Sequence, residues 1–322
     1  MGYELKSNTA WENREGVKIT VITPAYNRAK TLQRTIDSIE KQTFNDWEYI
    51  IINDGSTDDT DAIIRAYLET STHPVLYIKK ENGGVHTARN LGFKYARGEL
   101  CTTMDSDDEF VPEALEVFWN TWKTLPQKKI YREIVAQCMD DDGNRVGESF
   151  PDNNNELPWN TARKICYATK GEHVAAFVTQ IMKENLFPEP DGVTFITENI
   201  LWRKLDVKYC SHYTNEMIGI YHKDGDDRLS GVHNNKSIQS CKNALYGATT
   251  YLNDWDIYGD GSSYMKEILR YGIMYHILKQ NPKTTAFVKK YPLKGLKNKS
   301  MFVVLYLPSL LSSWIYKKKR MN

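Results

Sequence analysis

The stretch "TTMDSDDEF" (residues 102–110) crowds four carboxylates into five positions: Asp105, Asp107, Asp108 and Glu109. Carboxylates this close repel one another unless they are protonated or a cation lies among them, and hard divalent cations prefer oxygen ligands. Residues two apart in an extended segment point the same way, so Asp105 and Asp107 can grip one ion together. An ion held in this way would neutralise a phosphate-bearing ligand such as a diphosphate.

Three other interpretations of this segment compete with the metal site. It can be a solvated acidic turn, although it directly follows the strand-like "LCTTM". An EF-hand loop would need glycine at its sixth position, where this sequence has Phe110. An aspartyl phosphatase loop would need a threonine soon after the acidic pair. The chain also lacks G-x-G-x-x-G and the P-loop lysine motif, so a metal ion is the favoured means of binding phosphate.

The elements around this segment alternate between strands and helices, which is typical of an open, doubly wound parallel sheet. The inner face of the second helix is assigned to Ile63, Ala66 and Tyr67. The predicted strands are 17–23, 47–54, 74–80 and 99–104, and the predicted helices follow Thr31, follow "GSTDDT", and cover 83–98.

Polar segments follow three of the predicted strands at the point where each strand ends. These segments are "PAYN", "NDGS" and "DSDD". Ligands bind outside the carboxyl ends of the strands in such sheets, so we expect the three segments to share one ligand site.

Together, "VITPAYNRAKTLQRTIDSIEKQTFNDWEYIIINDGSTDDT", "ENGGVHTARNLG" and "MDSDDEF" closely resemble the nucleotide-sugar-binding half of family 2 glycosyltransferases, over residues 17–120. The resemblance implies the GT-A fold: an α/β, Rossmann-like, mostly parallel central sheet flanked by helices. It also implies inverting sugar transfer from a nucleotide sugar, with a UDP-sugar as the expected donor and Mn²⁺ or Mg²⁺ as the cofactor.

The resemblance assigns the nucleobase to the loop after the first strand and to "NDGS". In the first loop, Pro24, Tyr26, Asn27 and Arg28 match the residues that hold the base, and Tyr26 is placed to stack on it. Asp54 matches the carboxylate that reads an N–H of a pyrimidine. Without this role, Tyr26 would be a core residue and Asp54 a turn residue.

The resemblance assigns the sugar phosphates to "GG…ARN" and to the acidic segment. Gly84 and Arg89 match the first of these motifs, in which the arginine supports either the carboxylates or the phosphates. Asp105 matches the residue that binds the ribose and the metal, and Asp107 the residue that binds the metal–diphosphate. Asp108 is the third member of this acidic cluster.

An inverting transfer needs one carboxylate as general base on the acceptor hydroxyl. The segment "FITENILWRKL" (195–205) resembles the family's acidic pair at a helix start, which makes Glu198 the expected base. This sequence departs from the family because Thr197 precedes Glu198 and Asn199 follows it. The alternative is that Glu198 only caps a helix.

The segment "YHKDGDDRLS" (221–230) resembles the family's later loop over the diphosphate. It makes His222 a candidate third metal ligand and Arg228 a candidate phosphate ligand. By contrast, "CMDDDGNRVG" (138–147) predicts a plain hairpin, and no chemistry is assigned to its acids.

Composition predicts a folded protein of a reducing compartment. The 322 residues are 41% hydrophobic, and the five cysteines form no C-x-x-C pair. The N-terminus has no apolar stretch that could serve as a signal peptide. We expect an N-terminal arm (1–16), a GT-A domain (17–230, with donor half 17–120 and acceptor half 121–230) and a helical C-terminal region (231–322).

The C-terminal region combines apolar and basic residues. After Glu267 there is no acid but there are 12 Lys and Arg, and "MFVVLYLPSLLSSWIY" (301–316) is interrupted by Pro308. The pattern favours an amphipathic segment over 294–320 that lies on an anionic membrane, which implies a cytoplasmic protein peripheral to the inner face of the cell membrane. The alternative is a helix packed on the core or on a second copy. The apolar block argues against nucleic acid as a partner.

The function expected from these features is transfer of a sugar to a glycan or lipid-linked glycan acceptor in surface polysaccharide biosynthesis. The unusual Thr-Glu-Asn at 197–199 leaves open a second possibility. This is a catalytically inactive nucleotide-sugar-binding subunit or sensor of the same fold.

Overall fold

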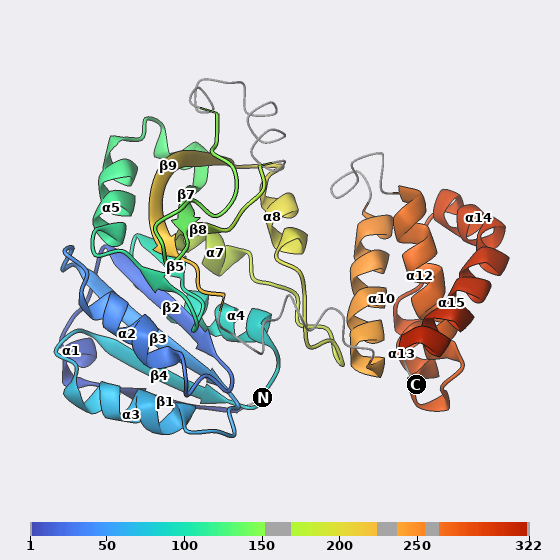
Figure 1. Cartoon of the computed structure of the whole chain (residues 1–322), viewed down its shortest axis with the longest axis horizontal. Helices are drawn as coiled ribbons and strands as arrows, with labels where there is room; N and C mark the ends of the chain where they lie inside the picture. Colours follow the sequence, from blue (N-terminus) through green and yellow to red (C-terminus); the bar gives the residue numbers. More distant parts are fainter. Residues whose placement is uncertain (1, 152–168, 224–236, 255–263, 321–322) are drawn as a thin grey trace. The chain divides into compact units, whose positions relative to one another are not determined.

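The computed structural model describes residues 2–151, 169–223, 237–254 and 264–320 (Figure 1). The chain divides into two compact units, Met1–Leu186 with Lys208–Gly225 and Phe187–Val207 with Asp226–Asn322. Residues 187–207, which the sequence analysis placed within 17–230, therefore group with the C-terminal residues.

The first unit is built on one mixed sheet of nine strands from the described residues, in the order β1-β4-β3-β2-β5-β8-β7-β9-β6. Neighbours from β4 to β5 run parallel, whereas β1, β8 and β6 pair antiparallel. The strands are β1 (Tyr3–Ser7), β2 (Ile19–Ala25), β3 (Trp47–Asp54), β4 (Val75–Lys80), β5 (Leu100–Thr103), β6 (Glu109–Phe110), β7 (Tyr131–Met139), β8 (His173–Val178) and β9 (Cys210–Ile220).

Helices cover both faces of this sheet because the central strands are apolar on both faces. On one face, side chains of α2, α3 and α5 join alternate residues of β2, β3 and β4 in the main core. On the other face α4 lies so close to β2 that a side chain at Gly92 would collide with Ile22. The helices of this unit are α1 (Thr9–Glu12), α2 (Leu32–Glu40), α3 (Thr60–Thr70), α4 (Val85–Tyr95), α5 (Ala114–Thr124) and α7 (Thr179–Glu184).

The α/β architecture expected from the sequence is confirmed, with the four expected strands observed as β2 to β5. The inner face of α3 is corrected in one respect: Ile64 is fully buried and Ala66 is exposed. Because α3 begins at Thr60, Ile64 and Tyr67 lie on one side of it, three residues apart. The expected hairpin forms, with Gly143 N–H donating to the carbonyl of Asp140.

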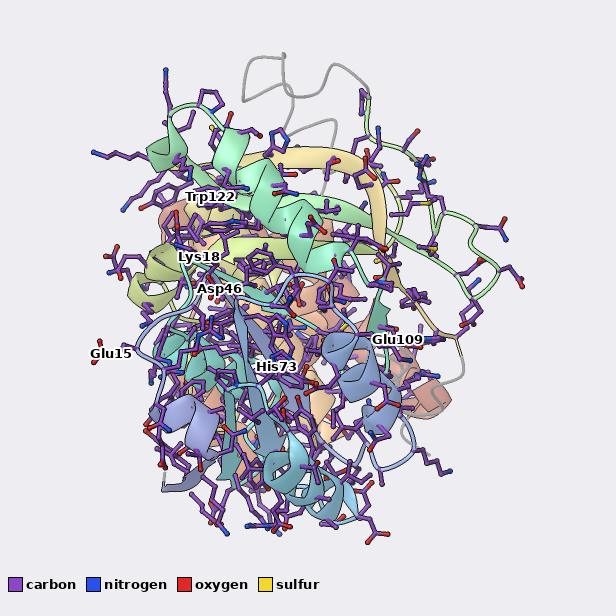
Figure 2. All side chains as sticks on the ribbon, turned by 90° about the vertical axis from the view of Figure 1, so that its left-hand side faces the viewer. Glu15, Lys18, Asp46, His73, Glu109 and Trp122 are labelled. Atoms are coloured by element: carbon purple, nitrogen blue, oxygen red, sulfur yellow. The ribbon has the colours of Figure 1, made fainter. Side chains whose placement is uncertain are left out.

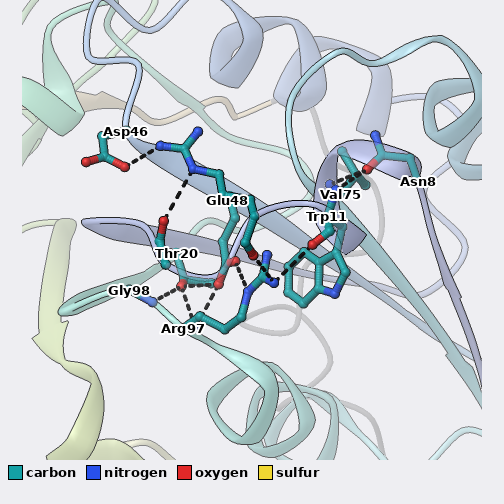
Figure 3. A network of polar contacts seen from close by, with 10 residues as sticks. Asn8, Trp11, Thr20, Asp46, Glu48, Val75, Arg97 and Gly98 are labelled. Atoms are coloured by element: carbon teal, nitrogen blue, oxygen red, sulfur yellow. Dashed lines mark hydrogen bonds and ion pairs between the residues drawn. The ribbon is translucent and has the colours of Figure 1, made fainter.

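A buried glutamate ties together the strand starts at the end of the sheet opposite the predicted site (Figure 3). The side chain of Glu48 is fully buried and pairs with Arg97 at 2.6 Å. Thr20 donates to the same carboxylate at 2.7 Å. The Arg97 guanidinium lies 3.7 Å from the ring centroid of Trp11 and donates to its carbonyl, which attaches α1 to the sheet.

We expect Glu48→Ala to lower the free energy of unfolding by about 3–5 kcal/mol, because it leaves a partly buried guanidinium and a hydroxyl without their acceptor. Urea unfolding of the purified protein measures this loss. Glu15→Ala is the matched control, because Glu15 is an exposed acid of the same unit and its loss should change the value by less than about 0.5 kcal/mol. Equal stability of Glu48→Ala and Glu15→Ala would contradict the stabilising role assigned to Glu48.

The second unit is helical and is centred on α12, which packs against α10 on one side and α15 on another. Its core joins residues of α10 and α12 with Val288 and Leu293. In the described part of the chain, no helix has the length and apolar character needed to cross a membrane. The helices are α8 (Asn199–Leu205), α10 (Ile238–Asn253), α12 (Tyr264–Lys279), α13 (Thr285–Lys290), α14 (Leu296–Val304) and α15 (Tyr306–Arg320).

Candidate functional site

The three polar segments at the carboxyl ends of β2, β3 and β5 are brought together, as their placement in the sequence predicts. The backbone N–H of Asn27 donates to the hydroxyl of Ser56 at 3.0 Å. The Asn27 amide oxygen accepts from the backbone N–H of Thr57 at 2.8 Å. Asn27 adopts a left-handed backbone (φ 53°), a conformation that asparagine tolerates better than most residues. These contacts hold the loop after β2 against the loop after β3.

The acidic segment is fixed to the start of α2 through its backbone carbonyls. Thr31 donates its hydroxyl to the carbonyl of Ser106, and Thr35 donates to that of Asp108, both at 2.8 Å. Arg34 donates from Nε to the carbonyl of Asp107 at 3.1 Å. Three side chains of α2 and its N-cap thus set the path of the segment that carries the carboxylates.

Nitrogen-bearing side chains lie among the crowded carboxylates. Arg89 on α4 pairs with Asp105 at 2.9 Å, and its side chain is 9% exposed whereas that of Asp105 is 54% exposed. His222, just after β9, lies 2.8 Å from Glu109, which is labelled in Figure 2. The guanidinium of Arg89 offsets part of the repulsion that the sequence implied, and Asp105 keeps an open side toward solvent.

His222 reaches the acidic segment across 113 residues of sequence, because β9 pairs antiparallel with β6. Its backbone N–H donates to the Asp108 carboxylate at 3.1 Å. Its second ring nitrogen contacts Asp141 of the hairpin. Both ring nitrogens thus contact carboxylates, so ligation of a metal by His222 would require one of these contacts to be exchanged. Among the described residues no group of three His, Cys, Asp or Glu side chains is arranged to hold a metal ion.

Asp54 is buried at the end of β3 and is held by three donors. The ammonium of Lys80 lies 2.5 Å from Oδ1, and the backbone N–H groups of Gly83 and Gly84 donate at 3.0 and 2.9 Å. Gly84 has a φ of 95°, which a residue with a side chain rarely adopts, and it is the N-cap of α4. Of the Asp54 oxygens, Oδ1 accepts two of these bonds and Oδ2 one, so Oδ2 can accept one more.

The first loop presents one aromatic side chain to solvent. Tyr26 is 46% exposed, although large aromatic residues are usually well buried. Arg28 is half-buried beside it, with its backbone N–H bonded to Thr60 at 2.8 Å. Pro24 lies inside β2, where it pairs with Ile52 and is buried, so it shapes the end of the strand.

A pocket of about 750 Å³ opens beside the Asp54 loop. Residues of the edge strand β1 line it together with residues of the loops after β3 and β4. Its lining includes Tyr3, Gly55, Ser56, Lys80, Glu81 and Asn82.

Sequence reasoning missed the roles of Lys80, Arg34 and the threonines Thr31 and Thr35. The only signal for Lys80 was a lysine at the end of an apolar strand, and lysine is usually exposed. The other three residues lie more than 70 positions from the carbonyls that they bind.

The two remaining expected residues belong to the second unit. Glu198 is exposed at the N-cap of α8 in the second unit, and its side chain makes no capping hydrogen bond. Its backbone carbonyl accepts from Leu201 and Trp202. Arg228 lies outside the described residues.

Comparison with known proteins places this geometry in a family. The model of glycosyl transferase family 2 matches residues 20–187, about half of the chain. A curated relative from Campylobacter jejuni, named GalNAc(5)-diNAcBac-PP-undecaprenol beta-1,3-glucosyltransferase, is 29% identical over 63% of this chain and 64% of its own. The chain spans less than two thirds of the length of the curated relatives it matches.

Solved structures agree in fold. The structure of S. aureus TarS 1-349 in complex with UDP-GlcNAc has a TM-score of 0.58 at 17% identity and covers 94% of this chain and 92% of its own. Mannosyltransferase PcManGT from Pyrobaculum calidifontis, in complex with GDP-Man and Mn²⁺, has a TM-score of 0.54 at 15% identity and covers 98% of this chain and 87% of its own. The fold is therefore the GT-A fold, and the chain belongs to glycosyl transferase family 2.

Proposed function

We propose that this protein is an inverting, metal-dependent glycosyltransferase that moves a sugar from a nucleoside diphosphate, a UDP-sugar in the first instance, to a glycan or lipid-linked glycan. The observation that carries the proposal is the carboxylate segment at the end of β5. Three side chains of α2 and its N-cap hold its backbone, and Arg89 neutralises Asp105. A segment fixed in this way can bind a charged ligand without first being ordered, which lowers the entropic cost of binding.

The residues present fit a divalent ion. Asp105 and Asp107 supply carboxylate oxygens, the ligands that Mn²⁺ and Mg²⁺ prefer. Two carboxylates leave most coordination positions for phosphate oxygens and water, which is typical of an ion that arrives with a diphosphate. When bound, the ion supplies charge neutralisation for the leaving diphosphate. His222 is the proposed third ligand, reached by exchange of its contact with Glu109 or Asp141.

The remaining donor contacts follow from the geometry of the loops. Tyr26 is exposed enough to stack on the base, and Asn27 and Arg28 set the loop beside it. Asp54 is proposed to accept a hydrogen bond from an N–H of the base at Oδ2, which can accept one more bond. Gly84 and Arg228 complete the proposed donor contacts.

Glu198 is proposed to take the proton from the acceptor hydroxyl while that oxygen attacks the sugar carbon. The C–O bond to the diphosphate breaks as the new glycosidic bond forms, so the configuration at that carbon is inverted. Glu198 is exposed at the N-cap of α8, where a substrate can reach it from solvent.

The names of relatives and neighbours support the choice of substrates. The Campylobacter jejuni relative is named for a lipid-linked (PP-undecaprenol) glycan, and two structural neighbours were crystallised with nucleotide sugars. We accordingly propose a role in surface polysaccharide synthesis, with the protein on the cytoplasmic face of the membrane through residues 294–320.

Release of UDP from a panel of UDP-hexoses and UDP-N-acetylhexosamines tests the proposal, with GDP-mannose as the alternative donor. We expect slow, Mn²⁺- or Mg²⁺-dependent release with water as acceptor for one donor, abolished by chelation. Failure to release any nucleotide with either metal, alone or with a glycan acceptor mixture, would contradict the proposal.

A further inference from the structure

A second pocket, of about 540 Å³, lies within the helical unit, between α12, α13 and α14. Its volume is in the range of small-molecule sites. Its floor is aromatic: the rings of Tyr271 and Tyr275 stack at 5.9 Å, and Phe302 meets both edge-on at 5.4 and 5.3 Å. Val288 and Leu293 add buried apolar atoms to the wall. The floor therefore suits an apolar group.

The rim of this pocket is cationic. Lys279 of α12, Lys289 of α13 and Lys299 of α14 line it, and none of its lining residues is acidic. In the described ranges none of these three lysines forms an ion pair with a carboxylate. The hydrogen bond between Lys279 and Tyr275 raises the pKa of Lys279, so the ammonium group of Lys279 stays charged. Three cations from three helices are most stable with an anion between them, and lysine is a common phosphate ligand.

The pocket is continuous with an apolar surface that faces outward. Val303 lines the pocket and is 71% exposed, and this surface goes on along α14 and α15. Its further members are Val304, Leu307, Leu311 and Trp314, each more than 60% exposed.

The opposite side of α15 is polar, which reverses the usual pattern of a surface helix. Ser309 and Ser313 are buried, and the Ser309 hydroxyl lies 3.1 Å from Nε2 of His276 on α12. Gly272 leaves room for Ser309 at this contact. Because the small residues face the bundle, the large apolar ones are left for an external apolar phase.

We propose that the pocket binds the phosphate head of a membrane lipid, while the apolar chains lie along the surface from Val303 to Trp314. The aromatic floor takes the glycerol or first chain carbons, and Lys279, Lys289 and Lys299 contact the phosphate oxygens. The inference deepens the membrane contact in the proposed function, and it requires nothing of the sugar-transfer chemistry. The lipid is either a bulk anionic phospholipid or a polyprenyl phosphate, since both join a phosphate to an apolar chain.

Co-sedimentation with vesicles tests this site. The full chain is mixed with vesicles of phosphatidylcholine alone, with phosphatidylglycerol added, or with polyprenyl phosphate added at the same charge. We expect at least about tenfold tighter binding to both anionic preparations than to the neutral one. Stronger binding to polyprenyl phosphate than to phosphatidylglycerol would identify polyprenyl phosphate as the ligand. Equal binding to the two would show that the pocket accepts the phosphate of any anionic lipid. Equal binding to neutral and anionic vesicles would overturn the proposal.

A matched pair of variants separates the contribution of the pocket lysines to vesicle binding from the effect of the total positive charge. Changing Lys279, Lys289 and Lys299 together to glutamine should weaken binding to anionic vesicles by about 100-fold, at about fivefold per lysine. The control changes three exposed lysines of the same unit outside the pocket, Lys204, Lys266 and Lys283, and should weaken it far less. Equal losses in the two triple variants would refute the pocket.

Fluorescence quenching tests separately whether the apolar chains lie along the proposed surface. Lipids brominated in their chains should quench the fluorescence of Trp314, and the quenched fraction should shrink in Trp314→Phe. The same quenching in both proteins would contradict contact with the chains. UDP release without vesicles measures sugar transfer separately: a chain that binds anionic vesicles through the pocket but releases no UDP would refute the proposed function alone.

Discussion

Replacing Asp107 by alanine is expected to lower metal-dependent sugar transfer by about 10³-fold. Asp107 belongs to the segment whose backbone is held by α2, so truncation should remove a carboxylate without moving the loop. Neutralisation of a leaving diphosphate is worth several kcal/mol, and each 1.36 kcal/mol is a factor of ten in rate. Steady-state rates at saturating Mn²⁺, with the substrate identified by UDP release, provide the measurement.

Asp142→Ala is the matched control for this variant. Asp142 is an exposed acid of the hairpin, to which no chemistry is assigned. Its replacement by alanine changes the net charge by the same amount as Asp107→Ala. Its activity should stay within about twofold of the parent chain, on the basis that surface changes away from a site have small effects. Loss of activity in Asp142→Ala as large as that in Asp107→Ala would show a nonspecific charge effect, and full activity of Asp107→Ala would remove Asp107 from the metal site.

Replacing Glu198 by glutamine is expected to lower turnover by about 10²- to 10⁴-fold while UDP binding is unchanged. Glutamine keeps the size of the side chain but cannot accept the acceptor's proton at neutral pH, and general bases contribute rate factors of this size. Because Glu198 makes no capping bond to α8, the substitution should leave the helix intact. Turnover with donor and acceptor, together with UDP titration, separates catalysis from binding.

Glu189→Gln serves as the control for Glu198→Gln, because Glu189 is an exposed glutamate earlier in the same segment of the second unit. It should retain nearly full turnover. Unchanged turnover in Glu198→Gln would exclude Glu198 as the base. A parent chain that binds UDP but transfers no sugar would favour the alternative of a nucleotide-sugar-binding subunit or sensor.

The strands and the loops that follow them were predictable from sequence because their signals are local. β3 (Trp47–Asp54) is a largely apolar run followed by a glycine turn, and these local signals place Asp54 at the end of the strand. The contacts that hold these loops were not predictable. Lys80 reaches Asp54 across 26 residues, and Arg34 reaches the carbonyl of Asp107 across 73. Such pairs are set by the order of strands in the sheet, which no local pattern encodes.

The C-terminal helices show the same limit. Pro308 was expected to interrupt the apolar run, but the break lies before it, at Leu305. Pro308 stands in the first turn of α15, where a missing N–H costs nothing because that donor has no partner within the helix. Which face of α15 turns inward depends on the fit of Ser309 against Gly272 and His276, and the apolar composition alone did not show it.

Calorimetric titration of UDP into the parent chain, with Mn²⁺ and then with a chelator, tests the central claim most directly. The claim is that the carboxylates at the end of β5 take up a nucleoside diphosphate through a divalent ion. We predict binding at least about tenfold tighter with Mn²⁺, and loss of that difference in Asp107→Ala. Equal affinity with and without the metal in the parent chain would contradict it.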